Sequence, residues 1–261
     1  KGQDLTTWDA RQMSGFRGKC CSIVFQDPMT SLNPVFTIGN QLREAIELHT
    51  ERKGKASLAR AIEMLELVGI NEPQKRVKQY PHELSGGMRQ RVKIAMALAC
   101  NPKIIIADEP TTALDVTIQA QILELMQSLQ KKMGMAVILV THDLGVIADM
   151  CDNIIVMYGG HICERGTADE IFYNPRHEYT KGLLRSIPNV NNMKEKLIPI
   201  AGTPINVLNL PKGCAFCARC DEAMKICLEQ QPEELTINEN HKAACWMNVR
   251  RMLEEEGGGA Q

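Results

Sequence analysis

The segment Ile104-Ile105-Ile106-Ala107-Asp108-Glu109-Pro110 decides the fold class of this chain of 261 residues. Its four consecutive apolar residues are typical of a strand that is buried on both faces of a parallel sheet. Two adjacent carboxylates, Asp108 and Glu109, follow at the point where such a strand meets its loop. Because ligands of α/β proteins bind at that edge of the sheet, the segment predicts an α/β protein with a functional site at this strand end.

A strand–helix–strand unit extends from this segment. The next apolar run covers residues 136–140, and Gly134 ahead of it predicts the end of a helix. The helix carries one apolar stripe, formed by Ile118, Ile122, Leu125 and Leu129. We therefore expect two parallel strands joined by a right-handed crossover. Further on, Gly159-Gly160 between two short apolar segments predicts a β-hairpin.

The remaining segments suggest three parts. Residues 37–99 contain helical patterns and no convincing strand, which predicts a helical subdomain inserted into an α/β core formed by residues 1–36 and 100–185. Residues 186–261 begin with a linker rich in asparagine and continue as a small cysteine-rich C-terminal module.

Charge and hydropathy exclude several classes of protein. Thirty basic and 31 acidic residues give a net charge of -1, which argues against a nucleic-acid-binding protein. The longest apolar runs, such as residues 135–140, are far too short to cross a bilayer, and no signal-peptide pattern is present. The sequence therefore predicts a soluble, cytosolic protein.

The cysteines are unevenly distributed. Of the ten in the chain, five lie between Cys214 and Cys245. A disulfide framework is typical of small secreted chains, and a chain of this length can bury a core without one. The clustering predicts a metal or iron–sulfur site, with reduced structural thiols as the alternative.

Several residues could contact the phosphates or the metal ion of a bound nucleotide. They lie after predicted strands or at the start of a predicted helix. Asp108 can hold a Mg²⁺ ion that bridges phosphates, and Glu109 can polarise an attacking water. In Leu84-Ser85-Gly86-Gly87 the serine can cap a helix, while the glycines let backbone N–H groups approach an anion. His142 could hydrogen-bond a phosphate oxygen, and Gln26 could orient water or a metal ion. Each of these signals alone also fits a structural role, as a solvated carboxylate pair, a helix cap or a polar strand end.

Together the signals stand in the chain order of the ATP-binding cassette (ABC) ATPases, which this chain resembles over roughly residues 1–185. The resemblance implies a P-loop NTPase-like core with catalytic Gln26, Glu109 and His142. It also implies nucleotide-binding and Mg²⁺-binding residues, namely Gln26 of the Q-loop, the signature residues Ser85, Gly86 and Gly87, the Walker B residue Asp108, and Asp115 of the D-loop Ala113-Leu114-Asp115.

Three further motifs are similar to those of the oligopeptide and dipeptide importer ATPases: residues 26–34, Tyr80-Pro81-His82-Glu83-Leu84 and residues 175–180. This resemblance implies a subunit that hydrolyses ATP to power peptide import. Its implied partners are a second ABC ATPase subunit, transmembrane permease subunits and, indirectly, an extracytoplasmic peptide-binding protein. Its implied location is the cytoplasmic face of the membrane, as a peripheral subunit.

The C-terminal cysteines also match that subfamily. Gly213-Cys214, Arg219-Cys220, Cys227 and Ala244-Cys245-Trp246 follow its pattern. The resemblance implies a [4Fe-4S] cluster on the four cysteines of this pattern, which would stabilise a segment too small for a core of its own. Zn²⁺ is the alternative metal, and whether Cys217 is a ligand stays open.

One family motif is absent from the sequence. The phosphate-binding loop, G-x-x-x-x-G-K-[ST], is expected well before Gln26, and only 25 residues precede that glutamine. We therefore expect an N-terminally truncated cassette that alone binds ATP poorly, since each missing charge-assisted hydrogen bond is worth about 1.5–3 kcal/mol. The alternative function is a non-hydrolytic fragment that donates its signature half-site or serves as an interaction module.

Overall fold

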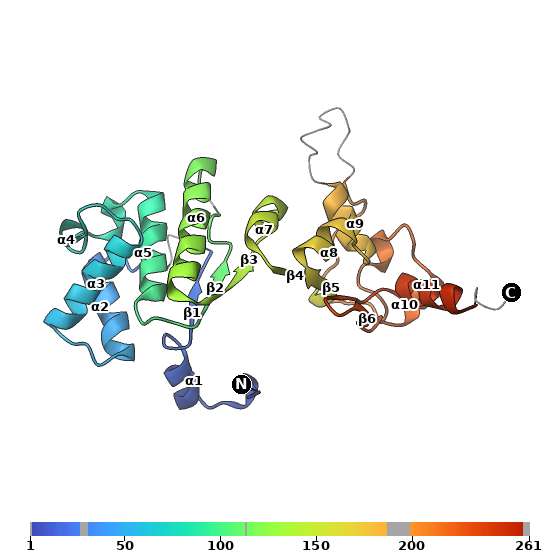
Figure 1. The fold of residues 1–261 in the computed structure, drawn as a ribbon, viewed down its shortest axis with the longest axis horizontal. Helices are drawn as coiled ribbons and strands as arrows, with labels where there is room; N and C mark the ends of the chain where they lie inside the picture. Colours follow the sequence, from blue (N-terminus) through green and yellow to red (C-terminus); the bar gives the residue numbers. More distant parts are fainter. Residues whose placement is uncertain (1, 27–30, 113, 187–198, 258–261) are drawn as a thin grey trace. The chain divides into compact units, whose positions relative to one another are not determined.

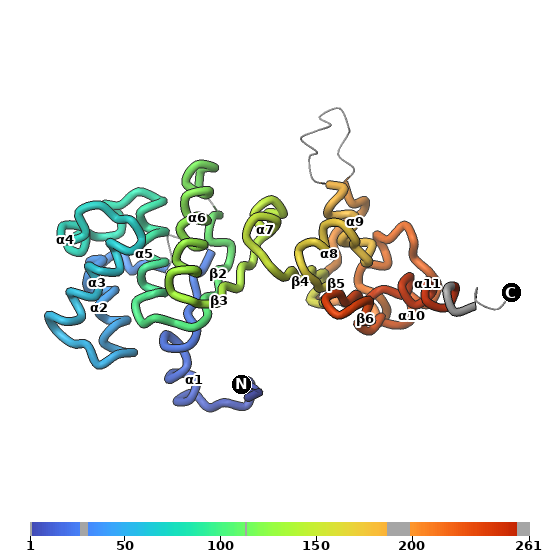
Figure 2. The backbone as a smooth tube through the Cα atoms, in the orientation of Figure 1, coloured from blue at the N-terminus to red at the C-terminus, as the bar shows by residue number. Residues whose placement is uncertain are grey.

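A computed structural model describes residues 2–26, 31–112, 114–186 and 199–257, without the side chains of residues 255–257. The chain divides into two compact units, Lys1–His142 and Asp143–Gln261. Figure 1 shows the helices and strands of each unit, and Figure 2 traces the path of the backbone through them.

Unit 1 contains a three-stranded parallel sheet of the order β1-β2-β3, built from β1 (Cys21–Val24), β2 (Ile104–Asp108) and β3 (Ala136–Val140). Val24 is paired with Ala107, which is paired with Leu139. The helix α6 (Val116–Met133) connects β2 to β3, as the apolar periodicity predicts. Its buried residues are Ile122, Met126 and Leu129, whereas Ile118 and Leu125 of the predicted stripe are only half-buried. Gly134 ends the helix with a left-handed φ of 63°.

Four helices lie between β1 and β2 in the sequence: α2 (Ile38–His49), α3 (Lys55–Leu67), α4 (Pro73–Arg76) and α5 (Gly86–Leu98). Side chains cap two of them, because Thr37 accepts a hydrogen bond from the Asn40 N–H and Ser85 accepts one from the Met88 N–H. The helices α2, α3 and α5 pack together through fully buried apolar residues that include Leu42, Ile46, Leu65 and Leu98. Short segments precede β1, namely η1 (Leu5–Thr7) and α1 (Ala10–Phe16), and η2 (Pro81–Glu83) precedes α5. The division into a helical subdomain and a core stays a prediction.

Unit 2 contains a four-stranded antiparallel sheet of the order β4-β5-β7-β6. Its strands are β4 (Asn153–Tyr158), β5 (His161–Thr167), β6 (Leu235–Asn238) and β7 (His241–Ala243). The predicted hairpin is confirmed: Tyr158 pairs with His161, and Gly159 and Gly160 between them have φ values of 58° and 82°. Positive φ at both central residues is what a two-residue hairpin turn of this kind requires. The other elements are α7 (Leu144–Met150), α8 (Ala168–Tyr173), α9 (Glu178–Arg185), η3 (Cys217–Arg219), α10 (Lys225–Glu229) and α11 (Trp246–Gly257).

The structure does not support the predicted cysteine-rich module as a separate structural unit. Strand β7 pairs with β5, so that Glu164 lies opposite Ala243 and Gly166 opposite His241. The region therefore completes a sheet that begins with the β4–β5 hairpin. The physical reason is size, because a short segment with few large apolar residues gains backbone hydrogen bonds and burial from a neighbouring strand. Of the predicted linker, residues 187–192 lie outside the described residues.

A buried network of charged and polar groups joins β7 to β5 and α8. The fully buried His241 ring lies 2.7 Å from Glu164 through Nε2 and 3.1 Å from Glu170 through Nδ1. Glu164 is also fully buried and accepts hydrogen bonds from the backbone N–H groups of Arg176 and His177. Every oxygen of the Glu164 carboxylate thus has a donor, as a buried carboxylate requires.

None of the helices in the described part of the chain combines the length and the apolar character needed to cross a membrane.

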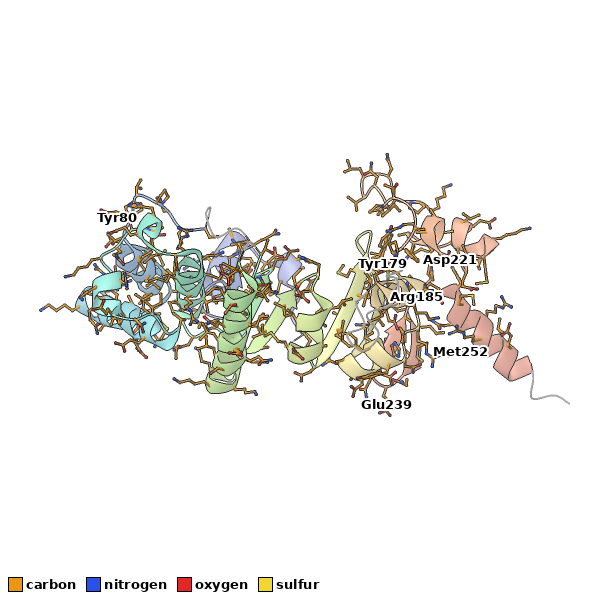
Figure 3. All side chains as sticks on the ribbon, turned by 90° about the horizontal axis from the view of Figure 1, so that it is seen from above. Tyr80, Tyr179, Arg185, Asp221, Glu239 and Met252 are labelled. Atoms are coloured by element: carbon orange, nitrogen blue, oxygen red, sulfur yellow. The ribbon has the colours of Figure 1, made fainter. Side chains whose placement is uncertain are left out.

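The network predicts that His241→Leu destabilises unit 2. Leucine fills a similar volume but removes both contacts and leaves the buried Glu164 short of a donor, so we expect a loss of about 3 kcal/mol or more in the free energy of unfolding. Denaturant unfolding measures the change. The control is Glu239→Gln, in the exposed turn between β6 and β7 (Figure 3), which should change the stability by less than about 0.5 kcal/mol. Equal unfolding midpoints for the two variants would contradict the prediction.

Candidate functional site

Three predicted site residues follow the three parallel strands of unit 1. Gln26 comes two residues after β1, Glu109 directly after β2, and His142 two residues after β3. Because neighbouring strands are parallel and in register, their carboxyl ends lie at one edge of the sheet. The structure brings all three side chains together at that edge.

Glu109 is the centre of this cluster. The Gln26 amide donates from Nε2 to Glu109 Oε2 at 2.5 Å, and His142 Nδ1 lies 3.0 Å from Glu109 Oε1. A third group, the Thr112 hydroxyl, donates to Oε2 at 2.8 Å. The sequence reasoning missed Thr112. Thr112 lies three residues after Glu109, a spacing at which a turn brings the chain back to the carboxylate. This spacing could have identified Thr112 from the sequence.

The backbone of Glu109 is held in an unusual conformation. Its φ of 43° lies in the left-handed region, which costs a residue other than glycine about 1–2 kcal/mol. The Glu109 N–H donates to the carbonyl of Val140, the last residue of β3, at 2.8 Å. This hydrogen bond ties the loop after β2 to the next strand, so the carboxylate has a defined position at the sheet edge.

The surroundings favour the ionised form of Glu109. The hydrogen bonds from Thr112 and His142 lower the pKa of its carboxyl below the ordinary value. The side chain is 24% exposed, whereas His142 is 79% exposed. Glu109 is therefore a carboxylate near neutral pH, held in place and partly open to water.

Asp108 is the last residue of β2 and lies opposite Val140 of β3. Among the described residues, no group of three or more His, Cys, Asp and Glu side chains converges on a point where a metal ion could sit. A single carboxylate fits Mg²⁺ nevertheless, because this ion is usually held by one or two carboxylates, waters and the phosphates of its nucleotide. Asp108 is the residue that would hold it.

The signature residues begin α5. Ser85 caps the helix through the Met88 N–H, at 3.3 Å, and no hydrogen bond among the described residues joins Ser85 to Glu109. Gly87 has a packing role that the sequence reasoning missed. A Cβ atom at this position would lie 2.8 Å from Cγ2 of Ile118 on α6, whereas one on Gly86 would meet only Leu114 at 3.7 Å. Gly87 therefore permits the close approach of α5 and α6.

The D-loop residue Asp115 acts as a helix cap in this structure. Its side chain accepts a hydrogen bond from the Ile118 N–H at 3.0 Å and begins α6. Its neighbour Ala113 and residues 27–30 of the Q-loop motif lie outside the described residues. A nucleotide-binding role for Asp115 stays a prediction.

The five clustered cysteines of unit 2 surround one small cavity, which His177 and Trp246 also line; the cysteines are Cys214, Cys217, Cys220, Cys227 and Cys245. Burial raises the pKa of Cys214 to about 11 and that of Cys220 to about 12. The free space between the side chains is about 10 Å³, which is roughly the space that one water needs. The soft thiol donors fit an iron–sulfur cluster or zinc by their chemistry, but this arrangement is not a ligand geometry.

Two other residues of the cysteine pattern have structural roles. A Cβ atom on Gly213 would lie 2.2 Å from the Cys227 carbonyl oxygen, so glycine is required there. Arg219 donates to the carbonyls of Ile200 and Ala201 at 2.9 and 2.8 Å and lies over the ring of Tyr158. Tyr158 in turn packs against Phe216 and Tyr179, the latter labelled in Figure 3. These contacts hold the segment in place beside the hairpin.

Comparison with known proteins supports the resemblance seen in the motifs. Residues 1–112 match the model of the ABC transporter family, and residues 163–227 match that of the oligopeptide/dipeptide transporter, C-terminal region. The dimeric ATP-binding cassette MJ0796, solved with ADP and Pi, is similar in fold. It has a TM-score of 0.57 and 30% identity, with 64% of this chain and 71% of that chain covered.

Two curated relatives come from Bacillus subtilis. The oligopeptide transport ATP-binding protein OppD is 54% identical over 95% of this chain and 69% of its own length. The dipeptide transport ATP-binding protein DppD is 51% identical over 96% of this chain and 75% of its own length. The predicted resemblance is confirmed: the chain belongs to the family of ATP-binding proteins of oligopeptide and dipeptide ABC transporters.

Proposed function

We propose that this chain hydrolyses ATP to power the import of oligopeptides or dipeptides by an ABC transporter. The observation that carries the proposal is the Glu109 carboxylate, which Gln26, Thr112 and His142 hold at the edge of the parallel sheet. A carboxylate that is ionised, oriented and partly open to water suits a general base. Family membership supports the same reaction.

The site residues have different roles in this reaction. Bound ATP with Mg²⁺ supplies the phosphoryl group that is transferred to water. Asp108 would hold the metal ion, which would neutralise charge on the phosphates, and Glu109 accepts the proton of the attacking water. Gln26 and His142 approach Glu109 from the two neighbouring strands and fix the direction of its two oxygens, so that little reorganisation is needed during the reaction.

This assignment predicts that Glu109→Gln abolishes most of the ATPase activity. The amide keeps the shape of the side chain but cannot accept a proton, so we expect the rate of hydrolysis to fall by about 10²–10⁴-fold while ATP binding persists. Phosphate release by the assembled transporter measures the rate. Glu124→Gln, on the exposed side of α6, is the control and should keep the wild-type rate. Equal rates for Glu109→Gln and the wild type would instead favour the non-hydrolytic alternative.

We also propose that the chain works as one of two ABC ATPase subunits, identical or different. The signature residues Ser85, Gly86 and Gly87 lie at the N-terminal end of α5, where backbone N–H groups and the helix dipole favour an anion. Within the described residues Ser85 makes no hydrogen bond to the Glu109 cluster. The similar cassette MJ0796 is a dimer with ADP and Pi bound, which supports a role in which the signature faces the nucleotide of the partner subunit.

Permease subunits are the second proposed partner, which would place the chain peripherally at the cytoplasmic face of the membrane. The extracytoplasmic peptide-binding protein would then act through the permease. Phe36 and Leu48 are 49% and 72% exposed, and they line an open hollow beside α2 together with Arg43, Glu47 and Lys53. Exposed apolar side chains that share one hollow rimmed by polar groups suit a protein–protein contact. We assign this hollow to the permease.

The assignment predicts that Leu48→Glu weakens the complex with the permease. A carboxylate would have to lose its hydration in an apolar contact, so we expect a decrease of at least tenfold in affinity, which corresponds to about 1.4 kcal/mol. Co-purification and titration with permease in detergent measure the affinity. Leu58→Glu, on the exposed side of α3, is the matched control. Retention of full affinity by Leu48→Glu would exclude the hollow as the docking site.

For the cysteine-rich segment we propose an iron–sulfur cluster held by Cys214, Cys220, Cys227 and Cys245, with zinc as the alternative. The support is the common cavity of these thiols and the family match over residues 163–227. Binding would need a small rearrangement that widens this cavity. A cluster would add a covalent cross-link to a segment that otherwise depends on β7 and Arg219.

The cluster proposal predicts about four iron and four sulfide per chain in protein purified without oxygen. Serine at any one of the four cysteines should lower the iron content strongly. Cys217→Ser, at the cavity but outside the family pattern, and Cys163→Ser, buried next to it, should retain it. Zinc without iron would favour the structural zinc site, and protein free of both metals would leave the thiols as reduced structural residues.

A further inference from the structure

The signature helix α5 reaches the catalytic edge of the sheet through two buried polar side chains. Gln90 is 1% exposed and donates from Nε2 to the carbonyl of Pro110 at 2.5 Å. Lys93 is 5% exposed and donates from Nζ to the carbonyl of Phe25 at 2.7 Å. The two residues are three positions apart, so they lie on the same side of the helix.

The two carbonyls flank the residues that form the centre of the site. Pro110 follows Glu109 directly, and Phe25 precedes Gln26 directly. Glu109 and Gln26 are themselves joined by a hydrogen bond. One helix therefore holds the main chain on both sides of this pair, and a displacement of α5 relative to the sheet would move both partners.

Burying polar and charged side chains costs free energy, because they lose their hydration. An ammonium group loses much hydration energy when it is buried, so polar partners must offset that loss. An apolar side chain of similar length would fill the same space without that cost. The neighbours Val92, Ile94 and Ala97 on α5 are apolar and buried, so the helix packs in the ordinary way apart from Gln90 and Lys93.

We propose that Gln90 and Lys93 are positioning residues that couple the signature end of α5 to the Gln26–Glu109 pair. The inference rests on the proposed ATPase function and adds to it a path of contacts from the signature residues to the Gln26–Glu109 pair. Engagement of Ser85–Gly87 by a phosphate of the partner subunit's nucleotide would pull on the start of α5. The two buried contacts would pass this displacement to the loops that carry Gln26 and Glu109.

The first test compares Lys93→Met and Gln90→Met in the assembled transporter. Each variant keeps the length of the side chain and removes the donor. Because a small misplacement of a catalytic group lowers the rate without affecting ATP contacts, we expect kcat to fall by about 10–100-fold with KM for ATP unchanged. Lys93→Arg retains a donor and should recover part of the rate. Arg91→Met is the matched control, since Arg91 lies on α5 but donates to the carbonyl of Val68 in the helical region.

A double-mutant cycle with Gln26→Ala then tests whether Lys93 affects the rate through Gln26. If Lys93 acts through the position of Gln26, Lys93→Met should lower kcat much less when Gln26 is already absent. Fully additive effects, a change in KM alone, or rates equal to those of Arg91→Met would overturn the proposal. So would a failure of both methionine variants to fold, because the contacts would then serve the fold and not the placement of the pair. A wild-type transporter that does not hydrolyse ATP would instead refute the proposed function.

Discussion

The parallel register of β1, β2 and β3 is the constraint on which the site depends. In a parallel sheet all strands end at the same edge, and each needs a crossover connection to begin again at the other. The loops after the three strands therefore lie side by side, although Gln26 and Glu109 are 83 positions apart in the sequence and Glu109 and His142 are 33 positions apart. The hydrogen bond from the Glu109 N–H to the Val140 carbonyl ties the loop after β2 to the end of β3. The helices between β1 and β2 and between β2 and β3 belong to the connections that this register makes necessary, and α5 also contacts the edge itself.

At this edge, polar groups from several elements converge on a single carboxylate. Gln26, Thr112 and His142 come from three different loops, and each satisfies part of the hydrogen-bonding capacity of Glu109. The donors hold the carboxylate in its ionised form and in one orientation, at the cost of a left-handed backbone conformation. Stored strain of this kind is typical of functional sites, where the surrounding structure maintains a conformation that the residue alone would not choose. The buried contacts of Gln90 and Lys93 belong to the same support.

Unit 2 shows how a segment without a large apolar core is stabilised. Its tail completes a sheet with the β4–β5 hairpin, and His241 links β7 to the carboxylates of Glu164 on β5 and Glu170 on α8. Aromatic rings and Arg219 hold the loop that carries the cysteines. The thiols thus gather around one cavity because their backbone is fixed by other contacts. This arrangement provides a framework for the proposed cluster without itself forming a ligand geometry.

Local patterns in the sequence were sufficient to predict much of the fold. The periodicity of α6, its end at Gly134, the apolar strands β2 and β3, and the turn at Gly159-Gly160 each depend on a few neighbouring residues. The order of the motifs was sufficient to predict the family and to select Gln26, Glu109 and His142 as candidate site residues. The pairing of β7 with β5 was decided only by the tertiary structure, as were the hydrogen bond from Thr112, the packing role of Gly87 and the contacts of Gln90 and Lys93. The Thr112 contact depends on the fold of one loop. The others join residues that are far apart in the sequence, and the energy of such a contact exists only when the whole chain brings both partners together, so no local pattern records it.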